Sequence, residues 1–127
     1  MIVYIRFSAY KNGFMKNQTL EREINLLHER VCSALGDTTR IMILYLLDGN
    51  PLFVNEIADA LDSPQSTISR HLRILRERNL VDTEREGTSV RYSLKDKRII
   101  QALNTLRALL NDQIQAEAAI TQANAEK

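Results

Sequence analysis

Residues 62–80 read DSPQSTISRHLRILRERNL, and the interpretation of the whole chain starts from this stretch. Ser63 can cap a helix, and Pro64 fits the first helical turn, where a missing N–H costs nothing. Between Ile68 and Leu80 the apolar residues recur at a helical period, which predicts an amphipathic helix. Its first turns carry short polar side chains, an amide and a guanidinium, and these groups suit base edges and phosphates.

Apolar periodicity predicts three further helices upstream of this stretch. Gly36 ends the first of them, and Asp37 is a suitable N-cap for the second. Only Asp62 and Ser63 separate the third helix from the one described above, so the two form a predicted helix-turn-helix, whose second helix enters a DNA major groove. The expected helices span residues 19–35, 38–47 and 54–61, and a turn of sequence DGNP occupies residues 48–51.

After Leu80 the apolar period changes from that of a helix to the two-residue alternation of a strand. Two short strands are predicted over residues 81–85 and 89–94, and Gly87 between them can adopt the positive φ of a tight turn. A hairpin beside a helix-turn-helix is a wing. The expected fold class is therefore mainly α with a small β-hairpin, a winged helix-turn-helix, followed by a last helix over residues 97–119.

The bulk composition limits the classes of protein that this chain can belong to. Its 127 residues suit one domain, and 44% hydrophobic with 26% charged residues is typical of a folded soluble protein. The net charge is only +1, so a surface for nucleic acid has to be a local patch. No apolar run approaches the roughly 20 residues of a membrane span, so no membrane partner is expected. The single cysteine fits a reducing, cytoplasmic location.

The chain divides into an N-terminal extension at residues 1–14, a winged domain at 15–119 and a frayed tail at 120–127. The extension holds four of the seven aromatic residues and fits strand and helix templates alike. A mobile arm and a segment that packs against a dimer partner are both compatible with it.

Contacts to DNA are expected from the polar first turns of the helix in residues 62–80 and from nearby arginines, since cations meet phosphates and polar groups meet base edges. Arg40 lies at a helix N-terminus, which favours phosphate, although an interaction within the fold is an equal alternative. Glu84 and Glu86 flank the tip of the hairpin, so its contribution should be modest, and a solvated hairpin is the alternative. The expected DNA contacts are Thr39, Arg40, Gln65, Ser66, Thr67, Ser69, Arg70, His71, Arg73, Arg85 and Arg91.

Four motifs follow one another along the chain, namely ALGDTTRIMIL (34–44), NEIADAL (55–61), STISRHLRILRERNLV (66–81) and REGTSVRYSL (85–94). In this order and spacing the chain resembles the ArsR/SmtB family of bacterial and archaeal winged-helix repressors, over about residues 24–114. The resemblance implies a homodimer that binds a palindromic operator. It also implies an inducer, often a metal ion, that weakens DNA binding.

The metal sites that the resemblance implies are not matched by this sequence. The cysteine motif of one site falls on residues 52–55, LFVN, which offer no thiolate for a soft metal. At the other site, on the last helix, Asp96 is present, but Arg98 stands where a histidine ligand is needed. The second ligand pair of that site falls near Leu109 and Asp112. We therefore expect no metal and no cofactor, and the effector stays unidentified.

The first and last helices each carry an apolar stripe, which predicts dimerisation through both of them, although core packing accounts for part of each stripe. Cys32 lies just off the first stripe, one turn from His28. A buried structural cysteine is the default interpretation, and an intersubunit disulfide or a thiol modification is the sharper alternative. The expected interface residues are Leu20, Ile24, Leu27, Leu103, Leu106, Leu110 and Ile114.

The sequence shows no Ser-His-Asp set, paired carboxylates, Gly-rich phosphate loop or metal quartet, so an enzyme is not expected. The expected function is that of a homodimeric, sequence-specific transcriptional regulator, a repressor that an unidentified effector releases from its operator. A winged-helix module that docks on proteins without binding DNA is the alternative, and the near-zero net charge is compatible with it. The salt dependence of DNA binding distinguishes the two.

Overall fold

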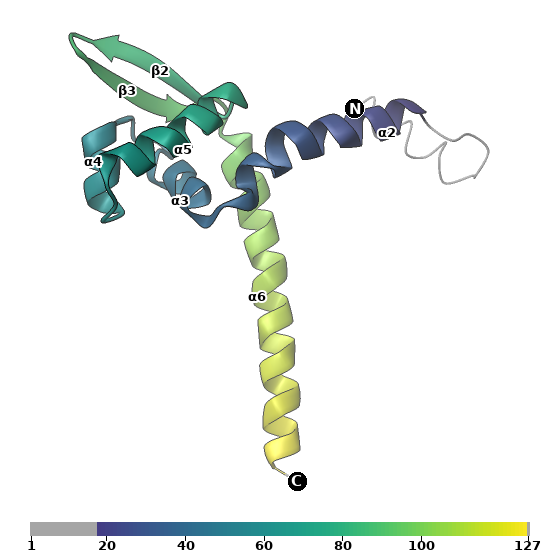
Figure 1. Ribbon diagram of the computed structural model, residues 1–127. Helices are drawn as coiled ribbons and strands as arrows, with labels where there is room; N and C mark the ends of the chain where they lie inside the picture. Colours follow the sequence, from purple (N-terminus) through teal and green to yellow (C-terminus); the bar gives the residue numbers. More distant parts are fainter. Residues whose placement is uncertain (1–17, 127) are drawn as a thin grey trace.

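The computed structural model describes residues 18–126 and has the expected mainly helical, winged helix-turn-helix architecture (Figure 1). In chain order its elements are α2 (Gln18–Leu27), a π-helical turn (His28–Cys32), a 3-10 turn (Ala34–Gly36), α3 (Thr38–Leu46), β1 (Leu52–Phe53), α4 (Val54–Ala60), α5 (Gln65–Glu77), β2 (Val81–Glu86), β3 (Ser89–Leu94) and α6 (Arg98–Ala125). Helices α3, α4 and α5 pack beside the sheet, and we call this assembly the body. Residues 1–14, the expected extension, lie outside the described residues.

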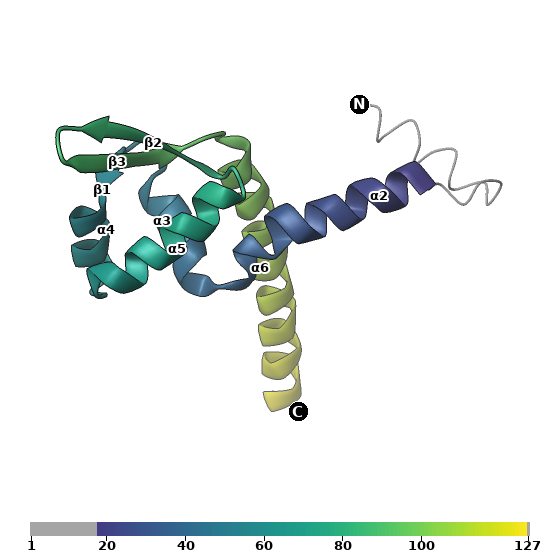
Figure 2. The ribbon, with the colours of Figure 1, turned by 45° about the horizontal axis from the view of Figure 1, so that its top comes forward.

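One hydrophobic core joins the body to the start of α6 (Figure 2). Ile43 of α3, Ile57 of α4 and Leu72 of α5 are fully buried in it. Ile100 and Leu103 add the first turns of α6 to the same core. Burial of one such side chain stabilises the fold by roughly 1.5–3 kcal/mol relative to exposure. The position and orientation of α5 are therefore fixed by contacts along its whole inner face.

Helix α5 begins later than its sequence suggests. Pro64 is its N-cap and lies outside the helix, while the Ser63 hydroxyl donates to the Leu61 carbonyl at 3.3 Å instead of capping α5. The expectation that Ser63 caps this helix was thus wrong. The cause is the left-handed backbone of Asp62, with a φ of 49°, which turns the chain between α4 and α5. The helix ends at Glu77, and the chain then turns into β2.

The wing contains the predicted hairpin and a third strand that was not predicted. Strands β2 and β3 pair from Val81 opposite Leu94 to Glu86 opposite Ser89. Gly87 forms the turn with a φ of 63°, as its place in the sequence suggested. Strand β1 pairs antiparallel with β3, so the sheet order is β1-β3-β2. A two-residue strand is too short to show an alternating pattern, which is why sequence reasoning missed it.

The helix expected over residues 19–35 is not uniform. Regular α-helix ends at Leu27, and the chain continues through the π-helical and 3-10 turns to Gly36, where the predicted stop is found. We call residues 28–36 the junction. Helix α2 projects away from the body on the far side of the junction (Figures 1 and 2), and Ile24 on this projecting helix is 52% exposed.

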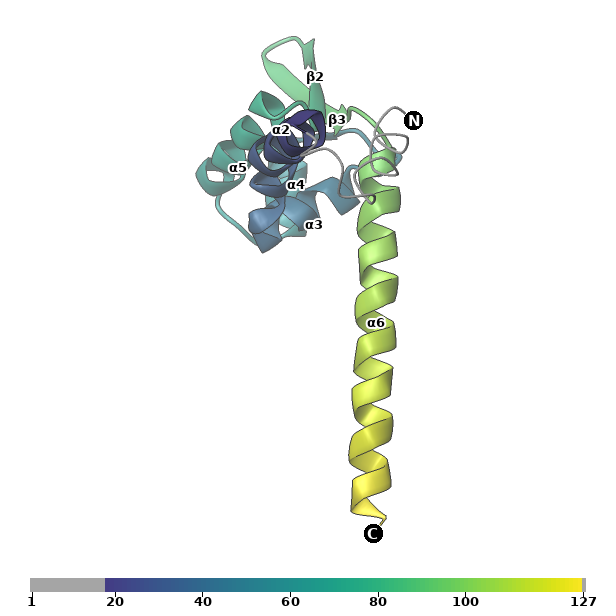
Figure 3. The same cartoon turned by 90° about the vertical axis from the view of Figure 1, so that its right-hand side faces the viewer.

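Helix α6 is longer than expected and runs on to Ala125, so most of the tail that was expected to be frayed is helical. Its last turns are rich in alanine, glutamine and glutamate, which are strong helix formers. Only the N-terminal part of α6 lies beside the body, and the remainder extends beyond it (Figure 3). Within residues 18–126, no helix combines the length and the apolar character that crossing a bilayer requires.

Two residues expected at a dimer interface are buried within the single chain instead. Leu103 is 6% exposed and belongs to the core, and Leu20 is 7% exposed on α2. The apolar stripe on α6 is buried in the core at the first turns and exposed to solvent further along. The sequence does not show where the buried part ends and the exposed part begins. The interface candidates that are exposed by half or more are Ile24, Leu27, Leu106, Leu110 and Ile114.

Candidate nucleic-acid interface

Helix α5 divides its side chains between a buried and an exposed face. Ile68, Leu72 and Leu75 are fully buried, so the positions between them point outward. Thr67 and His71 lie at the edge and are half-buried. The helix thus presents a polar face to solvent, where five of the expected DNA contacts lie: Gln65, Ser66, Ser69, Arg70 and Arg73.

A polar cleft of about 340 Å³ lies between the N-terminal half of α5 and the wing. Gln65 and Ser69 line it from α5, Asn55 lines it from α4, and Thr88 lines it from the tip of the wing. Figure 1 shows the wing folding back over α5 toward the side of α4. The cleft combines hydrogen-bond donors and acceptors on a concave surface, which is the chemistry that base edges and phosphates require.

Arg40 is engaged within the fold. Its Nε donates to the carbonyl of Ala34 at 2.6 Å, and its Nη2 donates to the carbonyl of Ser33 at 3.4 Å. Its Nη1 lies 3.3 Å from Nδ1 of His71. Arginine has no acceptor atom, so Arg40 is the donor in this contact. Of the two alternatives for Arg40, the structure has the interaction within the fold, and it uses His71 in the same way.

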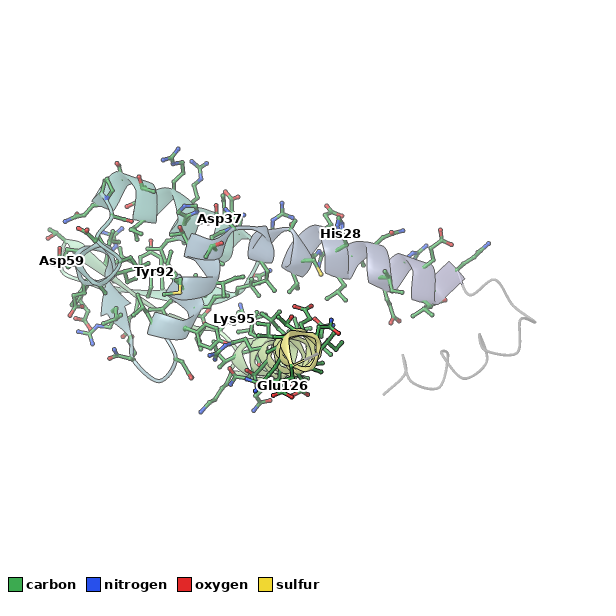
Figure 4. The ribbon with its side chains drawn as sticks, turned by 90° about the horizontal axis from the view of Figure 1, so that it is seen from below. His28, Asp37, Asp59, Tyr92, Lys95 and Glu126 are labelled. Atoms are coloured by element: carbon green, nitrogen blue, oxygen red, sulfur yellow. The ribbon has the colours of Figure 1, made fainter. Side chains whose placement is uncertain are left out.

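Thr39 and Asp37 form the start of α3. The Thr39 backbone N–H donates to Asp37 Oδ1 at 2.8 Å, which confirms Asp37 as the N-cap. Burial raises the pKa of Asp37, but the hydrogen bond from the Thr39 N–H and the nearby guanidinium of Arg40 act against it, and the pKa lies below its ordinary value. The negative charge that results stabilises the helix N-terminus. Figure 4 shows Asp37 near the point where the arm formed by α2 leaves the body.

The wing presents its two arginines differently. Arg91 lies with its guanidinium carbon 4.7 Å from the centre of the Phe53 ring, a cation–π contact. Its Nη2 also donates to Glu86 Oε2 at 3.1 Å, so the side chain is held on the outer side of the sheet. Arg85 is exposed near the hairpin turn. Of the two, Arg85 is the more exposed side chain.

The outer side of β2 is acidic. Asp82, Glu84 and Glu86 occupy alternate positions, and so they share one face of the strand. Lys95 lies 3.7 Å from Asp82, and Arg91 pairs with Glu86. These two ion pairs offset part of the negative charge of this face, and Glu84 lies between them along the strand.

Asp96 is paired with Arg98 at the start of α6. Their closest atoms, Oδ2 and Nη2, are 2.7 Å apart, and the Arg98 N–H donates to Asp96 Oδ1 at 2.9 Å. These hydrogen bonds from Arg98 lower the pKa of Asp96 from 3.8 to about 2. The carboxylate therefore accepts hydrogen bonds from both the backbone and the side chain of the first residue of α6. Within residues 18–126, no three His, Cys, Asp or Glu side chains gather to hold a metal ion.

Cys32 is a free, exposed cysteine at the end of the π-helical turn. The default expectation of a buried structural cysteine was wrong, because the irregular backbone of the junction changes the direction of its side chains relative to the stripe on α2. His28 begins the same turn and is also exposed (Figure 4). The thiol-based alternatives remain predictions.

Sequence reasoning missed two polar contacts that join distant parts of the chain. Arg78 at the end of α5 donates from Nη1 to the Glu29 carbonyl in the junction at 2.8 Å. Tyr45 of α3 donates to Asn104 of α6 at 2.8 Å, and Arg107 stacks over the Tyr45 ring at 5.2 Å. No local sequence pattern predicts such contacts, because one partner is a backbone carbonyl and the others lie on a different helix.

Comparisons with known proteins agree with this architecture. The model of the arsR family of bacterial regulatory proteins matches residues 37–83. NmtR, an HTH-type transcriptional regulator of Mycobacterium tuberculosis, is 42% identical over 71 residues, which are 56% of this chain and 59% of NmtR. An uncharacterized HTH-type transcriptional regulator of Methanocaldococcus jannaschii is 40% identical over 62% of this chain and 90% of that protein. Transcriptional repressor SdpR of Bacillus subtilis is 31% identical over 64% of this chain and 90% of SdpR.

Solved structures with the same fold cover most of the chain. Reduced HlyU from Vibrio cholerae gives a TM-score of 0.64 at 30% identity, over 72% of this chain and 96% of that chain. HlyU is named a transcriptional activator. The homodimeric winged helix-turn-helix DNA-binding domain Mb0332 of Mycobacterium bovis gives a TM-score of 0.65 at 28% identity, over 80% of this chain and 94% of that chain. The chain covers little more than half of NmtR, so the similarity to NmtR concerns the winged region.

Proposed function

This chain belongs to the ArsR family of bacterial regulatory proteins, a family of transcriptional regulators rather than enzymes, and we propose on this premise that it binds a DNA operator as a homodimer. Each subunit inserts the N-terminal half of α5 into a major groove. The observation that carries this proposal is the row of exposed polar residues on α5, with Arg70 among them, beside the polar cleft.

Dimerisation is proposed through the exposed apolar residues of α2 and α6. Leu106, Leu110 and Ile114 are half exposed or more, and a soluble helix rarely leaves such a stripe to water. The homodimeric state of the Mb0332 domain supports a homodimeric state here. In such a dimer the two α5 helices bind half-sites about one helical turn apart, roughly 34–36 Å.

The exposed guanidinium of Arg70 gives the first test of operator binding. The operator is first selected from random duplex DNA with the full chain, and the affinity of each variant is then measured by fluorescence anisotropy. Arg70→Ala should weaken binding by about 1–3 kcal/mol, since it removes a contact to a base or a phosphate. Arg22→Ala, a matched change of an exposed arginine on α2, should leave the affinity unchanged. Equal affinities for Arg70→Ala and the unaltered chain contradict the assignment of this residue.

We propose further that the regulator is a repressor, as SdpR is named, although the activator HlyU shares the fold. A dimer on an operator within a promoter blocks the polymerase, and an effector that releases the dimer restores transcription. A reporter fused to the selected operator decides between the two roles. Deletion of the regulator raises expression if it represses and lowers expression if it activates.

The effector is proposed to be something other than a metal ion bound at the start of α6. The Asp96 carboxylate is occupied by Arg98, and a guanidinium cannot ligate a metal. Zinc added at micromolar concentration to the complex of protein and operator should therefore leave its anisotropy unchanged. Cadmium serves as a second probe, and release of the operator by either metal overturns the proposal.

The acidic outer side of the wing favours one alternative function, the docking of the winged domain on a protein. Asp82, Glu84 and Glu86 give this side a negative charge, which suits a basic partner better than DNA. The affinity for random duplex DNA at several salt concentrations separates the two functions. A DNA-binding protein loses affinity steeply as salt rises, whereas a protein-docking module shows no such dependence.

A further inference from the structure

The junction is the only covalent connection between α2 and the body, and its backbone departs from regular helix. The π-helical and 3-10 turns leave carbonyl groups that no longer fit the bonding pattern of an α-helix. Helix α2 continues directly into the π-helical turn and projects away from the body (Figures 1 and 2). Whatever fixes the junction therefore also fixes the direction of α2.

Two arginines from different helices of the body hold carbonyl groups of the junction. Arg40 of α3 donates to the carbonyls of Ser33 and Ala34, at 3.4 and 2.6 Å. Arg78, which directly follows the last residue of α5, donates to the carbonyl of Glu29 at 2.8 Å. Charged donors at such carbonyls form stronger hydrogen bonds than neutral ones. The junction is thus fastened at both ends, once to α3 and once to α5.

Arg40 also connects the junction to the middle of α5. Its Nη1 contacts Nδ1 of His71, two residues after Ser69, which lines the cleft. The junction is therefore attached to α5 at two separate points. Arg40 contacts His71 in the middle of α5, and Arg78 is joined covalently to the last residue of α5. Two points of attachment fix an angle, whereas one point leaves rotation possible.

We propose that Arg40 and Arg78 are positioning residues, which hold α2 at a fixed angle to α5, and that they make no contact with DNA. This inference rests on the proposed function in one respect: α2 takes part in the dimer, so its angle sets the separation of the two α5 helices on the operator. A variant that loosens the junction then lowers the affinity of the dimer for an operator with two half-sites. The contacts of each α5 helix with its own half-site stay the same.

A distance measurement within one chain tests the positioning role without DNA. Spin labels are attached to Asn25→Cys on α2 and Arg76→Cys on α5, in a Cys32→Ser background, and labelled chain is diluted into unlabelled chain. Arg40→Gln and Arg78→Gln should each broaden the distribution of distances between the labels. Arg30→Gln, a change of an exposed arginine in the same junction, is the matched control and should leave the distribution unchanged.

Unchanged distributions in both glutamine variants overturn the proposal. Circular dichroism first verifies that each variant is folded. If the Arg40 variant unfolds, the Arg78 variant decides alone, because its hydrogen bond lies at the more exposed side of the junction.

A second measurement separates positioning from direct contact with DNA. Both glutamine variants should lose about tenfold in operator affinity, the loss expected for one charged hydrogen bond, while the salt dependence of binding stays as in the unaltered chain. A residue that contacts a phosphate would instead reduce the salt slope by about one when it is removed, and that result overturns the proposal. Failure of the unaltered chain to bind any DNA refutes the proposed function, and the distance measurement still decides the positioning role.

Discussion

Asp96 stands immediately before α6, with its carboxylate 2.7 Å from the Arg98 guanidinium. The resemblance to the ArsR/SmtB family implies a metal-binding role at this position, and the neighbouring residue changes that role. A histidine two positions on would be a second ligand, whereas an arginine is a permanent hydrogen-bond donor. The pKa of the carboxylate is consequently lowered to about 2, and its Oδ1 accepts from the Arg98 N–H at the start of α6.

The pairing of Asp96 makes stability depend on pH in a defined window. Its pKa is lower in the folded chain than its ordinary value of 3.8, so its contribution is fully present above about pH 4 and is lost as the pH falls through about 2. Asp96→Asn should therefore be less stable than the unaltered chain to urea at pH 7, and the difference should shrink below pH 4. Asp112→Asn, in an exposed part of α6, is the control. A difference that stays the same from pH 7 to pH 2 contradicts this account.

Arginines are the residues whose roles the sequence predicted least well. Arg40 was expected either on DNA or in an interaction within the fold, and the structure shows it bound to the Ala34 carbonyl. Arg91 was expected on DNA, and its guanidinium lies over the Phe53 ring. An arginine side chain is long and flexible and carries five donors, so it can reach several partners. Which partner it binds depends on the acceptors that the folded backbone places within its reach. Gln65 and Ser69 have shorter side chains, so their exposure follows directly from the helical period, and in the structure they also line the cleft.

At the scale of elements, the sequence predicted those whose pattern extends over several turns. The buried face of α5, from Ile68 to Leu75, follows the period of its apolar residues. The ends of elements depend on single backbone angles, such as the positive φ of Asp62, and no apolar pattern records them. The irregular turns of the junction were missed for the same reason, since residues 28–36 keep an apparently helical sequence.

Gly87 provides a test of the turn that closes the wing. Its φ of 63° lies in the left-handed region, and a Cβ built there meets no atom within 4 Å, so any cost of substitution comes from the backbone. Gly87→Val should lower the free energy of unfolding by about 1–2 kcal/mol, measured by urea titration. Gly87→Asn is the matched change, and it should cost less because asparagine tolerates this conformation. Equal costs for the two variants contradict the backbone explanation.

At the scale of the whole molecule, the body and α6 have different sources of stability. The body is held by one core that α3, α4, α5 and the sheet share. Beyond Leu103, α6 has no buried residue within the described chain, and its apolar side chains face solvent. The molecule therefore presents one long apolar surface that a second copy can cover.

Leu110 lies in the middle of this surface and tests it. Leu110→Glu places a charge in the proposed interface and should convert the dimer to a monomer, seen as a halved mass in light scattering after gel filtration. Gln101→Glu adds the same charge on the opposite side of α6 and should leave the mass unchanged. If both variants keep the mass of the unaltered chain, the dimer forms through another surface.

The length of α6 has a consequence for how the chain folds. Its 28 residues extend about 42 Å, at about 1.5 Å per residue, and only the first turns are anchored by Ile100 and Leu103. No residue of α6 beyond Leu103 is buried within the described chain, and most helical stability in proteins comes from the packing of an apolar face rather than from helix propensity. Helix formation in the outer part of α6 is therefore coupled to association. When the protein is diluted, amide hydrogens beyond residue 106 should exchange faster with solvent, while those of the body keep their protection. The fraction of chains in which the outer part of α6 is helical would then depend on the concentration of the protein in the cell.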